Sequence, residues 1–113
     1  MLFEIRSYHV RPDLIEAFKA WGQAEARPFL VQHLDVVGFW VNTKDAPEIH
    51  GEPQDKLGPA TFTWIIRWRD LAQRNDVVSR LFAGPEWKAI ASRRPGGTGT
   101  YLRTESKFAE LLS

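Results

Sequence analysis

The chain contains no cysteine in its 113 residues, which excludes disulfides, thiolate nucleophiles and cysteine-ligated metals. It also lacks a charge excess, because 15 basic and 14 acidic residues give a net charge of +1. That balance provides no electrostatic basis for binding nucleic acid or an anionic membrane. No apolar run approaches the ~18 residues of a membrane span, and Met1–Arg6 shows no signal-peptide core. We therefore expect one cytoplasmic domain spanning residues 1–113.

Patterns typical of metal and cofactor sites are missing as well. The histidines His9, His33 and His50 have no regular spacing. Glu48-x-His50-x-Glu52 lacks the second histidine or cysteine of a zinc pattern, so we expect no metal and no cofactor. Arg93 and Arg94 are adjacent, but two cations are too few to follow a phosphate backbone. They are interpreted as part of a solvated loop.

Aromatic residues are abundant, with five Trp, seven Phe and two Tyr. Thr61–Trp68 and Val36–Val41 read as β-strands because they are β-branched and aromatic. Both are apolar on both faces, whereas a sheet with one solvated face alternates apolar and polar residues. A chain of this length has helices for one face only. The remaining face is expected to be covered by a second copy of the chain, which predicts a homodimer.

Helical spacing and turn residues place the remaining elements. Pro12 and Asp13 suit the start of a helix, and Pro28 is expected to kink or restart it. Asp70 and Gln73 form a capping pair for the next helix. The predicted strands are Leu2–Val10, Leu34–Thr43, Ala60–Arg69 and Thr98–Glu105. The order β-α-β-β-α-β predicts a ferredoxin-like α+β fold, with four antiparallel strands and helices on one face.

Several short motifs, in order, resemble the NIPSNAP family of the dimeric α+β barrel superfamily. They are Phe3–Tyr8, Pro12, Val37–Trp40, Asp70–Arg74 and Pro85–Trp87. Trp68 departs from the family's usual Tyr, Asp13 replaces the Gly of its Lys-Pro-Gly pattern, and the loop Lys44–Pro59 is longer than usual. The resemblance implies a homodimer whose two sheets close a barrel. It implies no particular reaction, since relatives include cofactor-free oxygenases, isomerases, haem enzymes and proteins without known activity.

The first strand carries the main candidates for chemistry. Glu4, Arg6 and Tyr8 share one face at period two, and if Phe3 and Ile5 face the helices these three line the barrel. Arginine suits carboxylate or enolate groups, and tyrosine can donate to an oxyanion. Further candidates for the same cavity are Trp40, Asn42 and Arg67. The alternative interpretation is that Glu4 forms an ion pair with Arg6 or Arg67 that fills the interface.

Three functions remain open from the sequence. The first is a homodimeric protein that binds a small oxygenated or anionic organic molecule through Arg6, Tyr8, Trp40, Asn42 and Arg67. The second is a cofactor-independent monooxygenase or isomerase acting on an aromatic or polyketide-like substrate. It would need Tyr8, His9 or Glu4 to handle the proton. The third is a structural or interaction module with a filled barrel. The Lys44–Pro59 loop is either a lid or a surface excursion.

Overall fold

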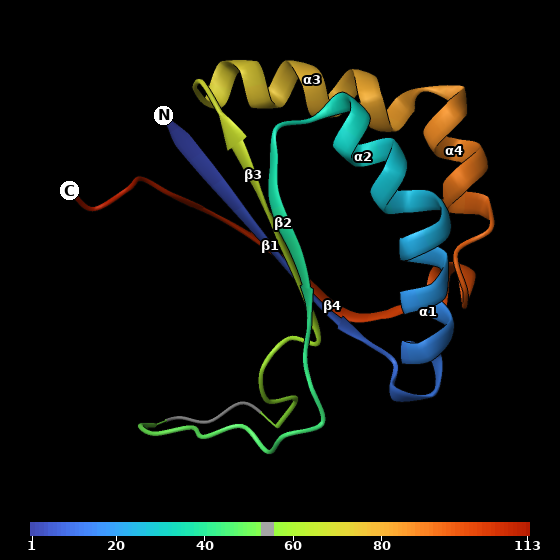
Figure 1. Ribbon diagram of the computed structural model, residues 1–113, viewed down its shortest axis with the longest axis vertical. Coiled ribbons are helices and arrows are strands. Elements are labelled where there is room, and N and C mark those ends of the chain that lie inside the picture. The colour runs from blue at the N-terminus through green and yellow to red at the C-terminus, as the bar shows by residue number, and fades with distance from the viewer. Residues whose placement is uncertain (53–55) are drawn as a thin grey trace.

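Four strands form one antiparallel sheet in the order β2-β3-β1-β4. They are β1 (Leu2–Val10), β2 (Val36–Val41), β3 (Phe62–Trp68) and β4 (Tyr101–Ala109). The structure is a computed structural model that describes residues 1–52 and 56–113. All helices lie on one side of the sheet (Figure 1). The predicted ferredoxin-like α+β fold is confirmed.

The last strand differs from its prediction. Thr98–Glu105 was expected, but β4 begins at Tyr101 and continues to Ala109. Gly97–Gly99 instead forms a 3₁₀ turn. The strand is extended at its far end because it pairs with β1 as far as the Phe3–Ala109 pair. Backbone pairing over the whole length of a neighbour outweighs the weak strand preference of its charged residues.

The helices are α1 (Ile15–Trp21), α2 (Arg27–His33), α3 (Leu71–Ala83) and α4 (Pro85–Ser92). Asp70 caps α3 as predicted, because its carboxylate accepts the Gln73 backbone N–H at 2.8 Å. The Gln73 side chain in turn accepts the Arg69 backbone N–H at 2.7 Å. Gly84 separates α3 from α4, and Pro85 occupies the first turn of α4, where a missing N–H costs nothing.

The interruption expected at Pro28 is a π-helical turn. Between α1 and α2, Gly22–Ala26 forms a wider turn in which the Arg27 N–H bonds to the Gly22 carbonyl. Pro28 then lies in the first turn of α2. A proline inside an uninterrupted α-helix would clash with the carbonyl four residues earlier. The wide turn therefore restarts the helix at a position that tolerates proline.

Strand pairing decides which face of β1 meets the helices. Strand β1 pairs with β3 so that Arg6 lies opposite Trp64 and Tyr8 opposite Phe62. Trp64 belongs to the core between the sheet and the helices, and the Trp68 indole bonds to Glu4. Glu4, Arg6 and Tyr8 therefore face the helices. The condition under which these three residues would line the barrel, with Phe3 and Ile5 facing the helices, is therefore not met.

The opposite face of the sheet carries no helix in the described part of the chain (Figure 1). Side-chain alternation puts Phe3, Ile5 and Ile65 on this open face, where each is only half-buried. Trp40 lies over Gly38 on the same face and is 50% exposed. An apolar, partly exposed sheet centre is a feature of protein interfaces.

Candidate functional site

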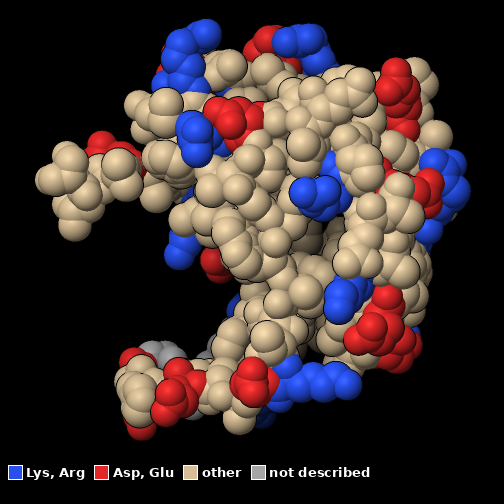
Figure 2. Space-filling view, in the orientation of Figure 1, with Lys and Arg blue, Asp and Glu red and all other residues tan. Residues whose placement is uncertain are grey.

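A cavity of about 560 Å³ lies between the sheet and the helices. Figure 2 shows it as a hollow with basic side chains at its margin. Its walls are mainly aromatic. The aromatic residues that line it are Tyr8, Phe18, Trp21, Phe39, Trp40, Phe62, Trp64, Phe82, Trp87 and Tyr101. Such walls favour a flat, apolar ligand body.

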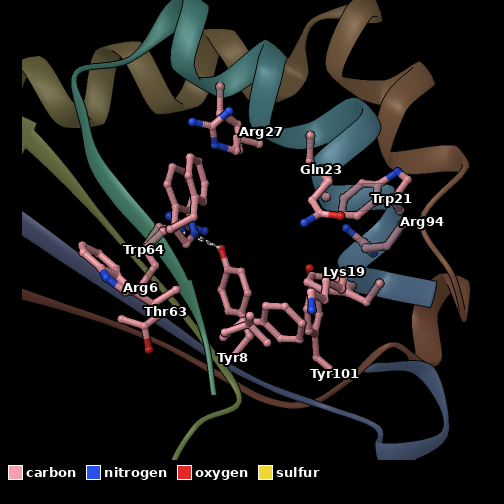
Figure 3. Close-up of a pocket in the computed structure, with 18 of the residues that line it drawn as sticks. Arg6, Tyr8, Lys19, Trp21, Gln23, Arg27, Thr63, Trp64, Arg94 and Tyr101 are labelled. Atoms are coloured by element: carbon pink, nitrogen blue, oxygen red, sulfur yellow. Dashed lines mark hydrogen bonds between the residues drawn. The ribbon is translucent and has the colours of Figure 1, made fainter. Parts of the chain in front are cut away.

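The sheet wall presents Tyr8 as a hydrogen-bonded group. Its hydroxyl accepts a hydrogen bond from Arg6 Nε at 2.9 Å and another from Trp64 Nε1 at 2.9 Å. Both donors come from the two central strands, β1 and β3. Figure 3 shows the three side chains converging on the sheet side of the cavity.

Behind this wall, Glu4 forms ion pairs with two arginines. Its side chain is 0% exposed and lies 3.0 Å from Arg6 Nη1 and 2.8 Å from Arg74 Nη2. Trp68 Nε1 donates a further bond at 3.0 Å. Burial raises the pKa of Glu4, but the Arg74 hydrogen bond, the Arg6 charge and the Trp68 bond together bring that pKa below its usual value. One carboxylate between two guanidiniums leaves the cluster positively charged.

Arg6 is the member of that cluster that reaches the cavity. Burial lowers its pKa, but the neighbouring Tyr8 and the Glu4 carboxylate outweigh this effect and raise it. Its guanidinium also lies 5.5 Å from the Trp64 ring centre and 5.9 Å from that of Phe82. Cation–π contacts and the ion pair therefore fix Arg6 in its charged form.

The helix wall adds polar and cationic residues that were not predicted as site residues. Lys19, Gln23 and Arg27 line the cavity, and all three are exposed at its rim. Figure 3 shows Lys19 and Gln23 across the cavity from Trp64 and Arg6, and Arg27 at its upper end. Their spacing of four residues, typical of one side of a helix, is the signal in the sequence that marks them.

Arg94 also lines the cavity, which corrects its interpretation as a solvated loop residue. Its neighbour Arg93 instead pairs with Glu25. The Arg94 guanidinium lies 5.1 Å from the Tyr101 ring centre. Within residues 1–52 and 56–113, Arg94 Nε is the one buried side-chain polar atom without a hydrogen-bond partner. A buried cationic donor in that state favours an acceptor supplied by a ligand or solvent.

Tyr101 shares this end of the cavity with Tyr8, and their ring centres are 4.9 Å apart. Burial, together with the nearby Tyr8, raises the pKa of Tyr101 to about 12, although Arg94 and Arg6 oppose the shift. Tyr101 is therefore a neutral phenol at physiological pH.

Two predicted binding residues do not enter this cavity. Arg67 lies on the open face, 3.9 Å from Asp35 and over the Phe3 ring. Asn42 is exposed, and its side chain donates to the Ala60 carbonyl at 2.7 Å. Trp40 contributes to the lining. On β3, Trp64 points toward the helices and Arg67 points to the open face, because successive side chains of a strand point to opposite faces of the sheet.

His9 lies on the other face of the sheet from Tyr8. It is buried, and its Nε2 is 3.0 Å from Arg103 Nη2. A separate hollow of about 220 Å³ there is lined by residues that include Ser7, Pro59 and Glu105. Neither His9 nor Glu4 lines the main cavity. Of the proposed proton-handling residues, only Tyr8 does.

The Lys44–Pro59 loop contributes no described residue to the lining of the main cavity. Figure 1 shows its described parts extending from the foot of the sheet on the side away from the helices. Residues 53–55 belong to this loop, for which the sequence left a lid and a surface excursion open, and they lie outside the described residues.

No group of three or more His, Cys, Asp or Glu is placed to hold a metal within the described residues. Glu48, His50 and Glu52 thus form no such group. Over the same described ranges, none of the helices combines the length and apolarity needed to cross a membrane.

Comparison with known proteins identifies the family of this chain. The NIPSNAP family model matches residues 3–108. The chain belongs to the NIPSNAP family. No curated protein matches this NIPSNAP chain.

Solved structures confirm the fold. An uncharacterised NIPSNAP domain protein from Burkholderia xenovorans is 20% identical, with a TM-score of 0.75 and coverage of 100% of this chain and 96% of that one. A NIPSNAP family protein of unknown function from Agrobacterium tumefaciens is 22% identical, with a TM-score of 0.73 and coverage of 96% and 86%. A structure described as an antibiotic biosynthesis monooxygenase is 11% identical, with a TM-score of 0.57 and coverage of 100% of both chains. At these identities the likeness concerns the fold alone.

Proposed function

We propose that this NIPSNAP protein binds a small organic anion with a flat, apolar body in the cavity between its sheet and helices. The observation that carries the proposal is the charge of the lining. Arg6, Lys19, Arg27 and Arg94 all line the cavity, and no Asp or Glu is among the described lining residues. The chain as a whole is nearly neutral, so this separation of charge is local.

Three of these cations are not neutralised by the surrounding protein. Arg6 shares Glu4 with Arg74, whereas none of the described carboxylates forms an ion pair with Lys19, Arg27 or Arg94. A carboxylate or similar anion at the rim would gain from all three. The aromatic walls would bury the remainder of the ligand, and the volume suits a molecule of one or two rings.

Fewer residues can serve an enzyme mechanism than the sequence suggested. Glu4 is fully engaged by two arginines, and His9 lies on the opposite face. The described lining contains neither a carboxylate nor an imidazole, the usual general bases. Binding is therefore the function that the cavity supports best.

The same proposal includes a homodimer formed through the open sheet face. Phe3, Ile5 and Ile65 are half-buried there, and Trp40 is 50% exposed. A second copy seated on this face would bury them at a gain of roughly 25 cal/mol per Å² of apolar surface. Most of the cavity lies on the other side of the sheet, but Trp40 also lines it, so dimer formation and ligand binding share this residue. We place this dimer in the cytoplasm.

The proposal is tested with two aromatic probes of matched shape. The acid para-benzylbenzoate should bind at least tenfold more tightly than the neutral para-benzylbenzamide, measured by titration calorimetry at pH 7. Combining Lys19→Gln with Arg27→Gln should remove most of that preference. Arg80→Gln is the matched control, because Arg80 pairs with Asp76 on the exposed face of α3. If the acid does not bind, or binds no better than the amide, the proposed function is wrong.

A further inference from the structure

The hydroxyl of Tyr8 has only one free hydrogen-bonding direction. A phenol offers one proton and two acceptor lone pairs. Arg6 Nε and Trp64 Nε1 donate to the oxygen, each at 2.9 Å. No acceptor for the Tyr8 proton is found in the described residues. Since Tyr8 lines the cavity, its proton is the group that it can offer to a ligand.

The two donors hold this arrangement in place. Trp64 is buried and stacks on Phe39, with ring centres 5.1 Å apart and planes 12° from parallel. Arg6 is tied on its other side to the buried Glu4. A free hydroxyl rotates to donate or accept as its partner requires. Here both acceptor directions are taken by N–H groups that cannot accept, so Tyr8 is a fixed donor.

We infer that the ligand carries a carbonyl oxygen that accepts the Tyr8 proton, in addition to the acidic group at the rim. This inference rests on the proposed function and specifies its ligand class as an aromatic keto acid. The carbonyl lies on the sheet wall beside Tyr8. The carboxylate lies toward the rim cations Lys19 and Arg27, which belong to the helix layer. The aromatic body spans the distance between them.

Polar groups at both ends of the site allow it to select between ligands that differ in one polar group. A ligand with a methylene in place of the carbonyl would leave the Tyr8 proton without an acceptor in a mostly apolar cavity. Leaving a buried donor without its acceptor costs roughly 1–3 kcal/mol, which is about fivefold to a hundredfold in the dissociation constant. The site would therefore distinguish a ketone from its reduced analogue.

The experiment compares para-benzoylbenzoate, an aromatic keto acid, with para-benzylbenzoate, which has a methylene in place of the ketone. We expect wild-type protein to bind the keto acid about tenfold more tightly, measured by calorimetry. In Tyr8→Phe the ratio of the two dissociation constants should fall to about one. In Trp64→Phe, which keeps an aromatic side chain but removes the Nε1 donor and so frees one Tyr8 lone pair, the ratio should lie between those values. Near-ultraviolet circular dichroism checks that each variant remains folded.

The outcomes separate the two claims. If both acids bind wild-type protein equally, the carbonyl inference is overturned while the proposed binding of an anion stands. A preference for the keto acid that survives in folded Tyr8→Phe protein overturns it too, because another group would then be the donor. If neither acid binds, the proposed function fails and this inference fails with it.

Discussion

Arg74 Nη2 on helix α3 lies 2.8 Å from Glu4 Oε2 on strand β1, joining positions 70 residues apart in the chain. This contact explains how a carboxylate can be buried at the centre of the sheet. Arg6 supplies the second cation, so Glu4 has a partner on each side. The cluster links the helix layer to the strand that carries the cavity residues Arg6 and Tyr8.

Removing the charge of Glu4 should destabilise the protein strongly. Glu4→Gln keeps the shape of the side chain but leaves two guanidiniums, each 21% exposed, without their anion. Breaking a buried ion pair on one side costs about 3 kcal/mol or more. We expect a loss of that order in the free energy of unfolding, measured with urea. Asp76→Asn is the control, because its pair with Arg80 is exposed and should contribute nothing measurable.

Acid should weaken the fold through the same residue. The folded-state pKa of Glu4 lies below its ordinary value of 4.5. Near that pH the unfolded chain binds more protons than the folded one, so stability rises with pH. The contribution of Glu4 is therefore present above pH 4.5 and is lost as the pH falls through the lower folded value. Unfolding measured from pH 6 downward should show this loss in wild-type protein, and a reduced loss in Glu4→Gln.

An alkaline titration should detect the raised pKa of Tyr101. The pKa of Tyr101 is raised from 10.0 to about 12 by burial and by Tyr8. Its ultraviolet ionisation step should lie near pH 12 and disappear in Tyr101→Phe. The unfolded chain loses this proton first, so the Tyr101 contribution to stability is present below pH 10 and declines toward pH 12. A step at pH 10 lost in that variant would contradict this assignment.

Native mass spectrometry should detect two chains, each of 13.0 kDa, if the open sheet face is an interface. Ile65→Glu puts a charge at the centre of that face and should give monomers at micromolar concentration. Val31→Glu is the matched control, because Val31 is an exposed apolar residue of helix α2 and its replacement should leave the dimer intact. A wild-type monomer would show that the open face has another role.

Strand periodicity predicted which residues of β1 share a face but not which face meets the helices. Phe3 and Ile5 look like core residues, and Glu4, Arg6 and Tyr8 look like residues of a polar lining. The decision depends on Arg74 and Trp68, which bond to Glu4 from distant positions in the chain. Local sequence carries no information about such pairing. The cap at Asp70 was predictable for the opposite reason, since its partner Gln73 is three residues away.

The sequence predicted only some of the residues that line the cavity. Arg6 and Tyr8 were predicted because they alternate on one strand, and both line it. Lys19 and Arg27 come from the opposite layer, and their position depends on how the helices cross the sheet. Arg94 follows α4, where no periodic pattern exists, so only the folded structure shows that it turns inward.

The π-helical turn at Gly22–Ala26 is a point at which the cavity rim can change in sequence length. In an α-helix each residue advances the chain by about 100°, so an insertion would normally rotate one half of the helix off the sheet. Phe18 before the wide turn and Phe29 after it are both buried, so the core tolerates a wider turn at this point. Gln23 lies within that turn and Arg27 just after it, and both line the cavity. A NIPSNAP chain that gains or loses one residue at this turn is expected to change its ligand preference without changing its fold.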